Sequence, residues 1–461
     1  MLTLRRENVG GVALNNPSPG HGRRNYSGLE TIEELHDIDE GDRVCPQCGA
    51  AYAPFGEERS EQVDWQVRIV RIVHRRATYR RTCRCPVRAV LVAPVPAKPI
   101  RKGRFTTQFL ARLLVEKYVL GRPLERIVAA LAADGLEVAK GTLVGVLQAL
   151  SVLLGPLDAA IRARNATAGH LHVDETSWWV FEDVAHKANH RWWLWVFVGP
   201  DTTVFAIEPT RSTKVVTSHL GIDLEAGSLE AGRRLLVSSD FFTVYQSLAR
   251  VEGVDPLWCW AHIRRYFIRA GDAHKELETW TAAWLEHIGI LYVAHRARSG
   301  KRVGSVEYEQ AAFDFALALD AIDVARQKQA RDAGLHPAAR KVLATLDHEW
   351  EGLARHGAFP ELPLDNNAAE RALRNPVVGR KNYYGSGSRW AAELAARVWT
   401  ITATASRAGC NPLTYLAAYL DACAQAGGRA PDGAALDRFL PYSATKEDLE
   451  IWRVALVGPG P

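Results

Sequence analysis

The chain has 461 residues, 47% of them hydrophobic and 24% charged, with a formal net charge of +5. This length exceeds one ordinary domain and predicts about two to four modules with real cores. No 18-residue apolar run occurs, and the opening MLTLRRENVG lacks the apolar core of a signal peptide, so we expect a cytoplasmic protein with no membrane partner. Seven cysteines, an odd number, favour metal ligands or buried thiols over a disulfide framework in that reducing compartment.

Charge is distributed unevenly over the first quarter of the chain. Residues 1–42 are polar and short of apolar periodicity, and 30–42 hold seven acids and no Lys or Arg, so we expect a partly disordered acidic arm. Residues 75–104 hold ten Lys or Arg and no acid. This run is either a solvated face or a surface for a polyanion, and the interleaved Tyr79 and Phe105 favour nucleic acid. Its candidate DNA contacts are Arg101, Lys102 and Arg104.

Residues 43–96 are predicted to form a small zinc-binding module of short β-like runs. Its four cysteines are Cys45 and Cys48, spaced CxxC, and Cys83 and Cys85, spaced CxC. Four thiolates can hold a tetrahedral zinc ion, which organises a module that lacks a large core. Four buried structural thiols are the alternative, and CxC is a tighter spacing than the common CxxC knuckle. The other cysteines lie in apolar surroundings and are expected in the core: Cys259, Cys410 and Cys423.

The pattern turns helical over 97–165. The apolar positions that share one helical face are Leu110, Leu113, Leu114 and Tyr118. A break at 133–135 precedes a second helix, which we expect to begin near Thr142 with that side chain as its cap. Short helices beside a basic run suit a helix-turn-helix-like DNA module, and an ordinary helical connector is the alternative.

From His170 onward, strand patterns alternate with helices in an α/β order. The runs LHVDETSWWVF, RWWLWVFV and TTVFAIEP predict an antiparallel meander, and RRLLVSSD and DPLWCWA predict two more strands. Helical sequence follows, then two further helices near Asn367 and over 389–408. We therefore expect an α/β domain in two parts, 166–272 and 359–427, with a helical insertion at 273–358 between them. The Gly/Pro-rich remainder, 428–461, is expected to be a weakly structured tail.

Two acids lie on the predicted strands. Asp174 lies in the first strand and Asp240 at the carboxyl end of the fourth, where open α/β sheets bind ligands. A buried carboxylate needs a partner or a metal ion. Because strand side chains alternate, Asp174 and Glu175 face opposite sides of the sheet.

A third acid, Glu370, lies in the run LPLDNNAAERALRN. With Asn367 as N-cap, Glu370 would complete a capping box three residues later. Alternatively it is paired with Arg371 or Arg374, its neighbours on the helix. A functional interpretation is that Glu370 joins the two aspartates.

Three such acids suit cleavage of a phosphodiester. Two Mg²⁺ ions about 3.5–4 Å apart activate the attacking oxygen and stabilise the leaving oxygen, and hard Mg²⁺ prefers carboxylate ligands. Like charges repel, so the ionised acids are expected mainly with metal bound. Basic side chains nearby are candidates for holding DNA phosphates: His172, Arg371, Arg374, Arg380 and Lys381.

The blocks HVDETSWWVF, LVSSDFFTVY, CWAHIRRYF and PLDNNAAERALRNPVVGRKNYYGS resemble, in order, the catalytic blocks of bacterial insertion-sequence transposases of the IS-sixty-six group. The likeness runs from about Cys45 to Asp421. It implies an RNase H-like DDE core, with the triad at Asp174, Asp240 and Glu370.

The resemblance also implies a zinc region ahead of the core, a helical region between them, and an insertion within the 129 residues separating the last two acids. It places His262 and Arg265 near the DNA or the active site. A satisfied core histidine at a strand-to-helix junction is the alternative for His262.

The predicted activity is that of a DDE-type DNA transposase. It would use two Mg²⁺ or Mn²⁺ ions at the active site and a structural Zn²⁺ to cleave element ends and join their 3′-hydroxyls to target DNA. The partners implied are DNA, further copies of the chain and accessory proteins of the same element. The alternatives are a decayed or domesticated copy that only binds DNA, and a metal-dependent nuclease that does not join.

Overall fold

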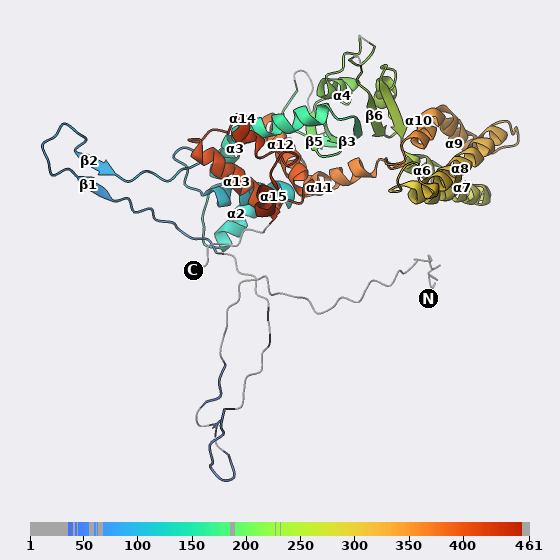
Figure 1. Cartoon of the computed structure of the whole chain (residues 1–461). Coiled ribbons are helices and arrows are strands. Elements are labelled where there is room, and N and C mark those ends of the chain that lie inside the picture. The colour runs from blue at the N-terminus through green and yellow to red at the C-terminus, as the bar shows by residue number, and fades with distance from the viewer. Residues whose placement is uncertain are drawn as a thin grey trace, which may run out of the picture. The chain divides into compact units, whose positions relative to one another are not determined.

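The computed structural model of the chain describes residues 36–39, 42–43, 45–54, 60, 62, 68–184, 190–225, 227–230 and 232–453. The chain forms two compact units, Met1–Gln66 and Val67–Pro461. All the helices and strands named below belong to the second unit (Figure 1). Most of the expected acidic arm at 1–42 lies outside the described residues, as do the last eight residues, 454–461.

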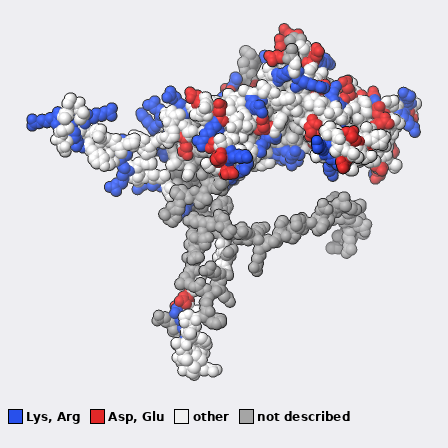
Figure 2. All heavy atoms as spheres, viewed as in Figure 1, with Lys and Arg blue, Asp and Glu red and all other residues white. Residues whose placement is uncertain are grey.

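The second unit begins with a basic ribbon of two antiparallel strands, β1 (Thr78–Arg80) and β2 (Val90–Val92), with Tyr79 opposite Leu91. Every residue of both strands is exposed. Figure 1 shows the ribbon standing apart from the helices of its unit, and Figure 2 shows Lys and Arg along it without an acid. Residues 75–92 of the acid-free run are all exposed to solvent.

A helical region follows the ribbon. Its segments are α1 (Thr107–Leu114), the π-helical turn η2 (Val115–Val119), α2 (Leu124–Ala133) and α3 (Lys140–Ala166). The predicted apolar face is confirmed, because Leu110, Leu113, Leu114 and Tyr118 are all buried. The predicted cap is wrong: Ala139 is extended, α3 starts at Lys140, and Thr142 lies inside the first turn.

Helix α3 is the one helix among the described residues that is long and apolar enough to cross a bilayer by length and composition. Its buried leucines, however, belong to the protein core, and the helix packs against α12 (Arg389–Arg407) and strand β5 (Thr203–Glu208). A buried core helix passes the same test of composition.

A five-stranded sheet forms the centre of the unit. Its strands are β3 (His170–Trp179), β4 (Arg191–Val198), β5, β6 (Leu235–Ser239) and β7 (Val254–Trp258), in the order β5-β4-β3-β6-β7. The predicted antiparallel meander of β3, β4 and β5 is confirmed. Strand β6 then pairs parallel to β3, and β7 parallel to β6, so the sheet is mixed and the fold is α/β. Two short helices connect strands, α4 (Thr213–Leu220) and α5 (Thr243–Leu248).

Helix α12 covers the edge strand β5. The hydroxyl oxygens of Thr400 and Thr404 accept hydrogen bonds from the backbone N–H groups of Phe205 and Thr203, at 2.9 and 3.1 Å. Trp399, on the same helix, is fully buried. An exposed edge offers unpaired N–H groups to other chains, and α12 satisfies two of these groups.

Helices separate β7 from the last helices of the chain. The first of them, α6 (Trp260–Ala273), falls in the expected first part of the α/β domain. The region of the expected insertion holds η3 (Lys275–Leu277), α7 (Glu278–Arg298), α8 (Val306–Ala330), α9 (Pro337–His348), α10 (Trp350–Ala354) and η4 (Arg355–Ala358). Buried Arg298 donates to the carbonyls of His356 and Gly357 at 2.6 and 2.9 Å. His356 bonds in turn to the carbonyl of Trp258, at 3.0 Å, so the base of the insertion is tied to the end of β7.

The chain returns to the sheet through α11 (Asn367–Tyr383) and ends in α13 (Pro412–Gln425), α14 (Gly433–Asp437) and α15 (Lys446–Arg453). The expectation of a weakly structured tail is wrong for 428–453. Phe439 stacks on Trp452, with ring centroids 5.5 Å apart, and both rings are buried. Two isolated aromatic residues anchor this segment, and they carry no periodic signal in the sequence.

The glycine at 385 is required by a close approach of two backbones. A Cβ there would lie 2.2 Å from the carbonyl oxygen of Trp179, at the end of β3, whereas one at Gly387 would meet nothing within 4 Å. We predict that Gly385→Ala lowers the free energy of unfolding by about 1–3 kcal/mol, the usual cost of overpacking, and that Gly387→Ala changes it little. Urea denaturation of both variants tests this, and equal midpoints would contradict it.

Candidate active site

Asp174 lies in β3, and Asp240 directly follows the neighbouring strand β6 at the same level of the sheet. The parallel register of β3 and β6 pairs His172 with Ser238, and each aspartate follows two residues later. Because strand side chains alternate, both aspartates share the sheet face of this pair. Burial first, and then repulsion from the charges of Glu175, Asp240 and Glu370, raise the pKa of Asp174 to about 8. Asp174 is therefore close enough to the other two predicted acids, Asp240 and Glu370, to be affected by their negative charge.

Glu370 is positioned by a buried asparagine one helical turn before it. Asn366, 1% exposed, donates from Nδ2 to the carbonyl of Val173 at 2.8 Å, and its Oδ1 lies 3.1 Å from Nδ1 of His172. Its backbone N–H bonds to Sγ of Cys259, just after β7, at 3.2 Å. Asn366 thus fixes the start of α11 against β3 and the end of β7.

His172 was predicted as a candidate for holding a DNA phosphate. In the structure its ring instead bonds to Asn366. The ring is buried against Asn366, and burial lowers its pKa to about 4. A neutral buried imidazole offers no charge to DNA, so His172 orients α11 instead.

The carboxylate of Glu370 is bound by a residue of α6, the helix that follows β7. Nη2 of Arg265 lies 2.9 and 3.0 Å from its two oxygens, and Nε2 of His262 lies 3.9 Å from Oε1. The predicted capping box is wrong, because the N-cap is Asn366 and Asn367 is already helical. His262 and Arg265 therefore lie beside Glu370.

His262 is half-buried beside two of the acids. Burial lowers its pKa, while the charge of Asp240 opposes that shift. Its Nδ1 is buried and has no hydrogen-bond partner in the described part of the chain. A buried polar atom without a partner is costly, so Nδ1 marks a position suited to a ligand atom or a water molecule.

A buried network under the site was missed by the sequence reasoning. Glu175, on the opposite face from Asp174, accepts hydrogen bonds from Arg211 and from the hydroxyl of Tyr245. Arg211 lies over the ring of Phe242, 3.7 Å from its centroid. The N–H of Phe242 donates to Oδ1 of Asp240 at 3.0 Å, so the network holds the loop that carries Asp240. The signal in the sequence was the predicted placement of Glu175 on the sheet face opposite Asp174, since an acid that becomes buried there needs partners.

The other predicted DNA contacts fall into two groups. Those exposed to solvent are Arg101, Lys102 and Arg104 before α1, and Arg371, Arg374 and Lys381 on α11. Arg380 is half-buried and donates from Nη1 to Thr176 at 3.2 Å and to Ser177, on β3. Arg380 therefore joins α11 to the sheet.

The predicted zinc cysteines are not buried. Cys45 is partly exposed, and Cys48, Cys83 and Cys85 are exposed, which contradicts the alternative of four buried thiols. Backbone N–H groups lower the pKa of Cys45 and of Cys83, which favours thiolates. The first pair lies in the first unit and the second in the ribbon, and their joint ligation of zinc stays a prediction. The remaining cysteines are buried, as predicted: Cys259, Cys410 and Cys423.

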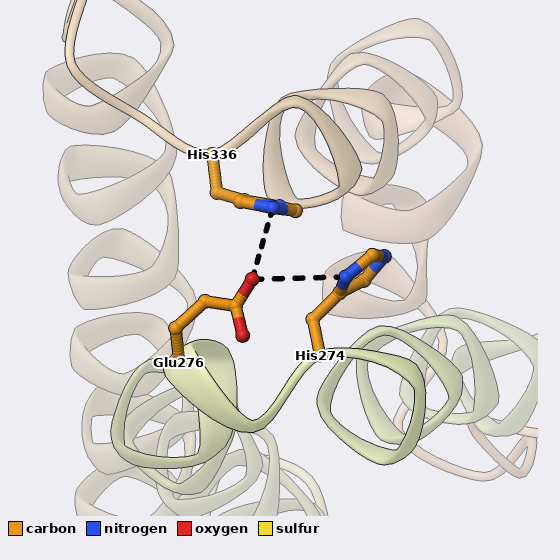
Figure 3. A group of neighbouring side chains, drawn as sticks. All are labelled: His274, Glu276 and His336. Carbon is orange, nitrogen blue, oxygen red and sulfur yellow. Dashed lines mark ion pairs between the residues drawn. The ribbon is translucent and has the colours of Figure 1, made fainter.

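A second cluster of titratable groups lies in the insertion (Figure 3). Oε1 of Glu276 lies 3.3 Å from Nε2 of His336 and 3.8 Å from Nδ1 of His274. Nδ1 of His336 accepts the N–H of Ala338 as the cap of α9, so the neutral ring carries its proton on Nε2. In this tautomer Nε2 donates to Glu276 and has no lone pair for a cation. The three residues therefore connect η3 to the start of α9.

Removing the side chain of Asn366 should loosen the whole site. We predict that Asn366→Ala lowers the free energy of unfolding by about 2–4 kcal/mol, because it leaves buried polar groups of β3 without a hydrogen-bond partner. The side chain of Asn367 makes no hydrogen bond among the described residues, so Asn367→Ala should change stability by less than about 0.5 kcal/mol. Equal denaturation midpoints for the two variants would refute the role of Asn366.

The raised pKa of Asp174 predicts a dependence of stability on pH in the presence of a chelator. Between the ordinary value of 3.8 and the folded value of about 8, the folded chain holds a proton that the unfolded chain has lost. The free energy of unfolding therefore falls as pH rises through this window. Asp174→Asn should flatten the fall in urea titrations across that range, and an unchanged slope would contradict the assignment.

Comparison with known proteins identifies the family. The family model described as "Transposase IS66 family" matches residues 102–394, which include all three acids. Three proteins of Sinorhizobium fredii, named uncharacterized proteins y4qI, y4jD and y4hP, are 26%, 28% and 23% identical to the chain. The matches span 86%, 83% and 84% of this chain and 73%, 75% and 72% of those proteins. The chain belongs to the IS66 family of transposases.

Proposed function

We propose that the chain is a DDE-type DNA transposase that cleaves the ends of a mobile element and transfers them into target DNA. The observation that carries this proposal is the convergence of Asp174, Asp240 and Glu370, from two adjacent strands and α11, in a chain of a transposase family. The strand order β5-β4-β3-β6-β7, with two antiparallel pairings followed by two parallel ones, supports an RNase H-like core.

The donor set suits divalent cations. Its oxygens are those preferred by Mg²⁺ and Mn²⁺. The raised pKa of Asp174 reflects burial first and then the negative charge of neighbouring acids, which a cation would relieve. Two such ions, when bound, would activate the attacking oxygen and stabilise the leaving one. The three carboxylates are the residues that would hold them.

The chain's own residues orient the acids and the DNA. Asn366 and the Glu175 network keep α11 and the loop of Asp240 in place. Arg265 and His262 offer donors beside Glu370, where a backbone phosphate can be held. The exposed arginines and lysine of α11 and the basic ribbon supply further phosphate contacts, so DNA affinity should fall steeply with salt.

The remaining parts of the proposal concern the modules ahead of the core. Cys45, Cys48, Cys83 and Cys85 would bind one structural Zn²⁺, and the helices of 97–165 would form a helix-turn-helix-like DNA-binding region. The active form would be a cytoplasmic oligomer on paired element ends, assisted by other proteins of the element. The exposed basic ribbon supports the DNA-binding part of this proposal.

Nicking of a DNA that carries the element's own end tests the catalytic assignment. We predict Mg²⁺-dependent nicking that falls by more than about 100-fold in Asp240→Asn, since residues that merely support a metal ligand cost up to that much. Binding of the same DNA should persist. Asp223→Asn, at an exposed aspartate of the same unit, is the matched control and should nick normally.

The outcomes separate the alternatives. Nicking by the wild type without joining of a pre-cut 3′-end would show a nuclease instead of a transposase. Binding without nicking, in the presence of the element's other proteins, would show a decayed binding protein. Equal loss in the control variant would refute the role of Asp240.

A further inference from the structure

The exposed face of α11 carries polar side chains that the fold does not use. The exposed residues of this helix are Arg371, Arg374, Asn375, Val378, Lys381 and Asn382. Asn382 donates to the carbonyl of Gly121 at 2.9 Å, whereas the other four polar side chains make no hydrogen bond or ion pair within the described part of the chain. Arg380, on the opposite side of the same helix, is bonded to Thr176 of β3. The four free side chains are therefore available to a partner.

The exposed residues form two rows along the helix. Three of them lie within an arc of about 60°, at 100° per residue, and are called the outer row: Arg371, Asn375 and Val378. The inner row, Arg374 and Lys381, lies between the outer row and Glu370 around the helix. A ligand held against the three acids therefore meets the inner row first and the outer row next.

The charge of this face favours a polyanion. No exposed residue of α11 is an acid, and the one acid of the helix, Glu370, is paired with Arg265. Asp365, just before the helix, accepts a backbone N–H of α11 at 3.0 Å, and Glu116 of η2, which packs against α11, is paired with two arginines. These acids do not offset the three cations of the face, which is the pattern of a surface that binds nucleic acid.

The outer row has the kinds of side chain that distinguish base pairs in the major groove. An arginine pairs with O6 and N7 of guanine, an asparagine pairs with N6 and N7 of adenine, and an apolar side chain contacts the methyl group of thymine. Val378, 53% exposed, gains such a contact in the groove but none from a phosphate. The row extends over seven residue steps, about 10 Å at 1.5 Å per residue, which corresponds to about three base pairs.

We propose that α11 lies in the major groove of the element end and reads about three base pairs beside the cut. The outer row contacts the bases, with Arg371 on a guanine and Asn375 on an adenine, and the inner row holds phosphates of the strand that reaches the acids. The bonds of Asn366 and Arg380 to β3 fix the helix against the sheet, so the bases lie at a fixed distance from the acids. This inference rests on the proposed function and deepens it, because it assigns sequence recognition to the catalytic domain itself.

Binding of DNA by the full-length protein without Mg²⁺ tests this recognition and requires no cleavage. The wild type should bind a duplex that carries the element's end at least about 100-fold more tightly than a duplex of shuffled sequence. Arg371→Ala and Asn375→Ala should each lower this ratio about fivefold or more, through loss of one bidentate base contact. Lys381→Ala should instead weaken binding of both duplexes alike and reduce its salt dependence by about one phosphate contact.

A matched control is Arg296→Ala, at an exposed arginine of α7 that has no ion pair among the described residues. It should change neither affinity. Because all the substituted side chains are exposed and make no hydrogen bond within the described ranges, every variant should keep the urea midpoint of the wild type.

Base-pair substitutions in the element end locate the contacts. Arg371→Ala should become indifferent to one G·C pair, and Asn375→Ala to one A·T pair. Both pairs should lie within about five base pairs of the cut, since Asn375 is only about 8 Å along the helix from Glu370. Indifference only at base pairs far from the cut would refute this placement of α11.

The remaining outcomes separate base recognition from other roles. A wild type that binds both duplexes equally would overturn the proposal, as would outer-row variants that leave the ratio of affinities intact. A fall in the ratio for Arg296→Ala as large as that for Arg371→Ala would overturn it too. If nicking fails but the ratio falls as expected, the recognition surface stands and the cleavage assignment fails.

Discussion

The site depends on the buried hydrogen bonds of Asn366. This one side chain connects β3, through Val173 and His172, to the first turn of α11, and its backbone connects α11 to the end of β7. Glu370 lies one turn further along α11 and therefore reaches the aspartates only while these bonds hold. Buried polar groups are costly when a partner is lost, so the arrangement is both rigid and vulnerable.

A surplus of negative charge is the second constraint. Burial first, and then the charges of Glu175, Asp240 and Glu370, raise the pKa of Asp174. Arg265, on α6, forms an ion pair with Glu370. Helix α6 is thus connected to the site, and the helices that follow it are fixed to β7 through Arg298 and His356. A divalent cation would compete with Arg265 for the same carboxylate.

Local patterns in the sequence predicted the strands, the position of Asp174 within the first of them and that of Asp240 at the end of the fourth, because alternation and helical periodicity are local signals. The roles of Asn366 and Glu175 could not be predicted in this way. Asn366 contacts His172 across 194 residues, and Glu175 meets Tyr245 across 70, so only the folded chain brings them together. The capping box at Asn367 and the cap at Thr142 failed because longer-range contacts and backbone geometry place the helix starts earlier. The packed tail was missed because its anchors, Phe439 and Trp452, are isolated aromatic residues.

The proposed chemistry requires that Asp174, Asp240 and Glu370 form one cation site. Anomalous diffraction from crystals of the full chain soaked in Mn²⁺ can locate such a site. We expect manganese peaks among the three carboxylates, with the guanidinium of Arg265 moved away from Glu370. Ordered carboxylates without manganese, or manganese bound only at other residues such as His274 and Glu276, would contradict it.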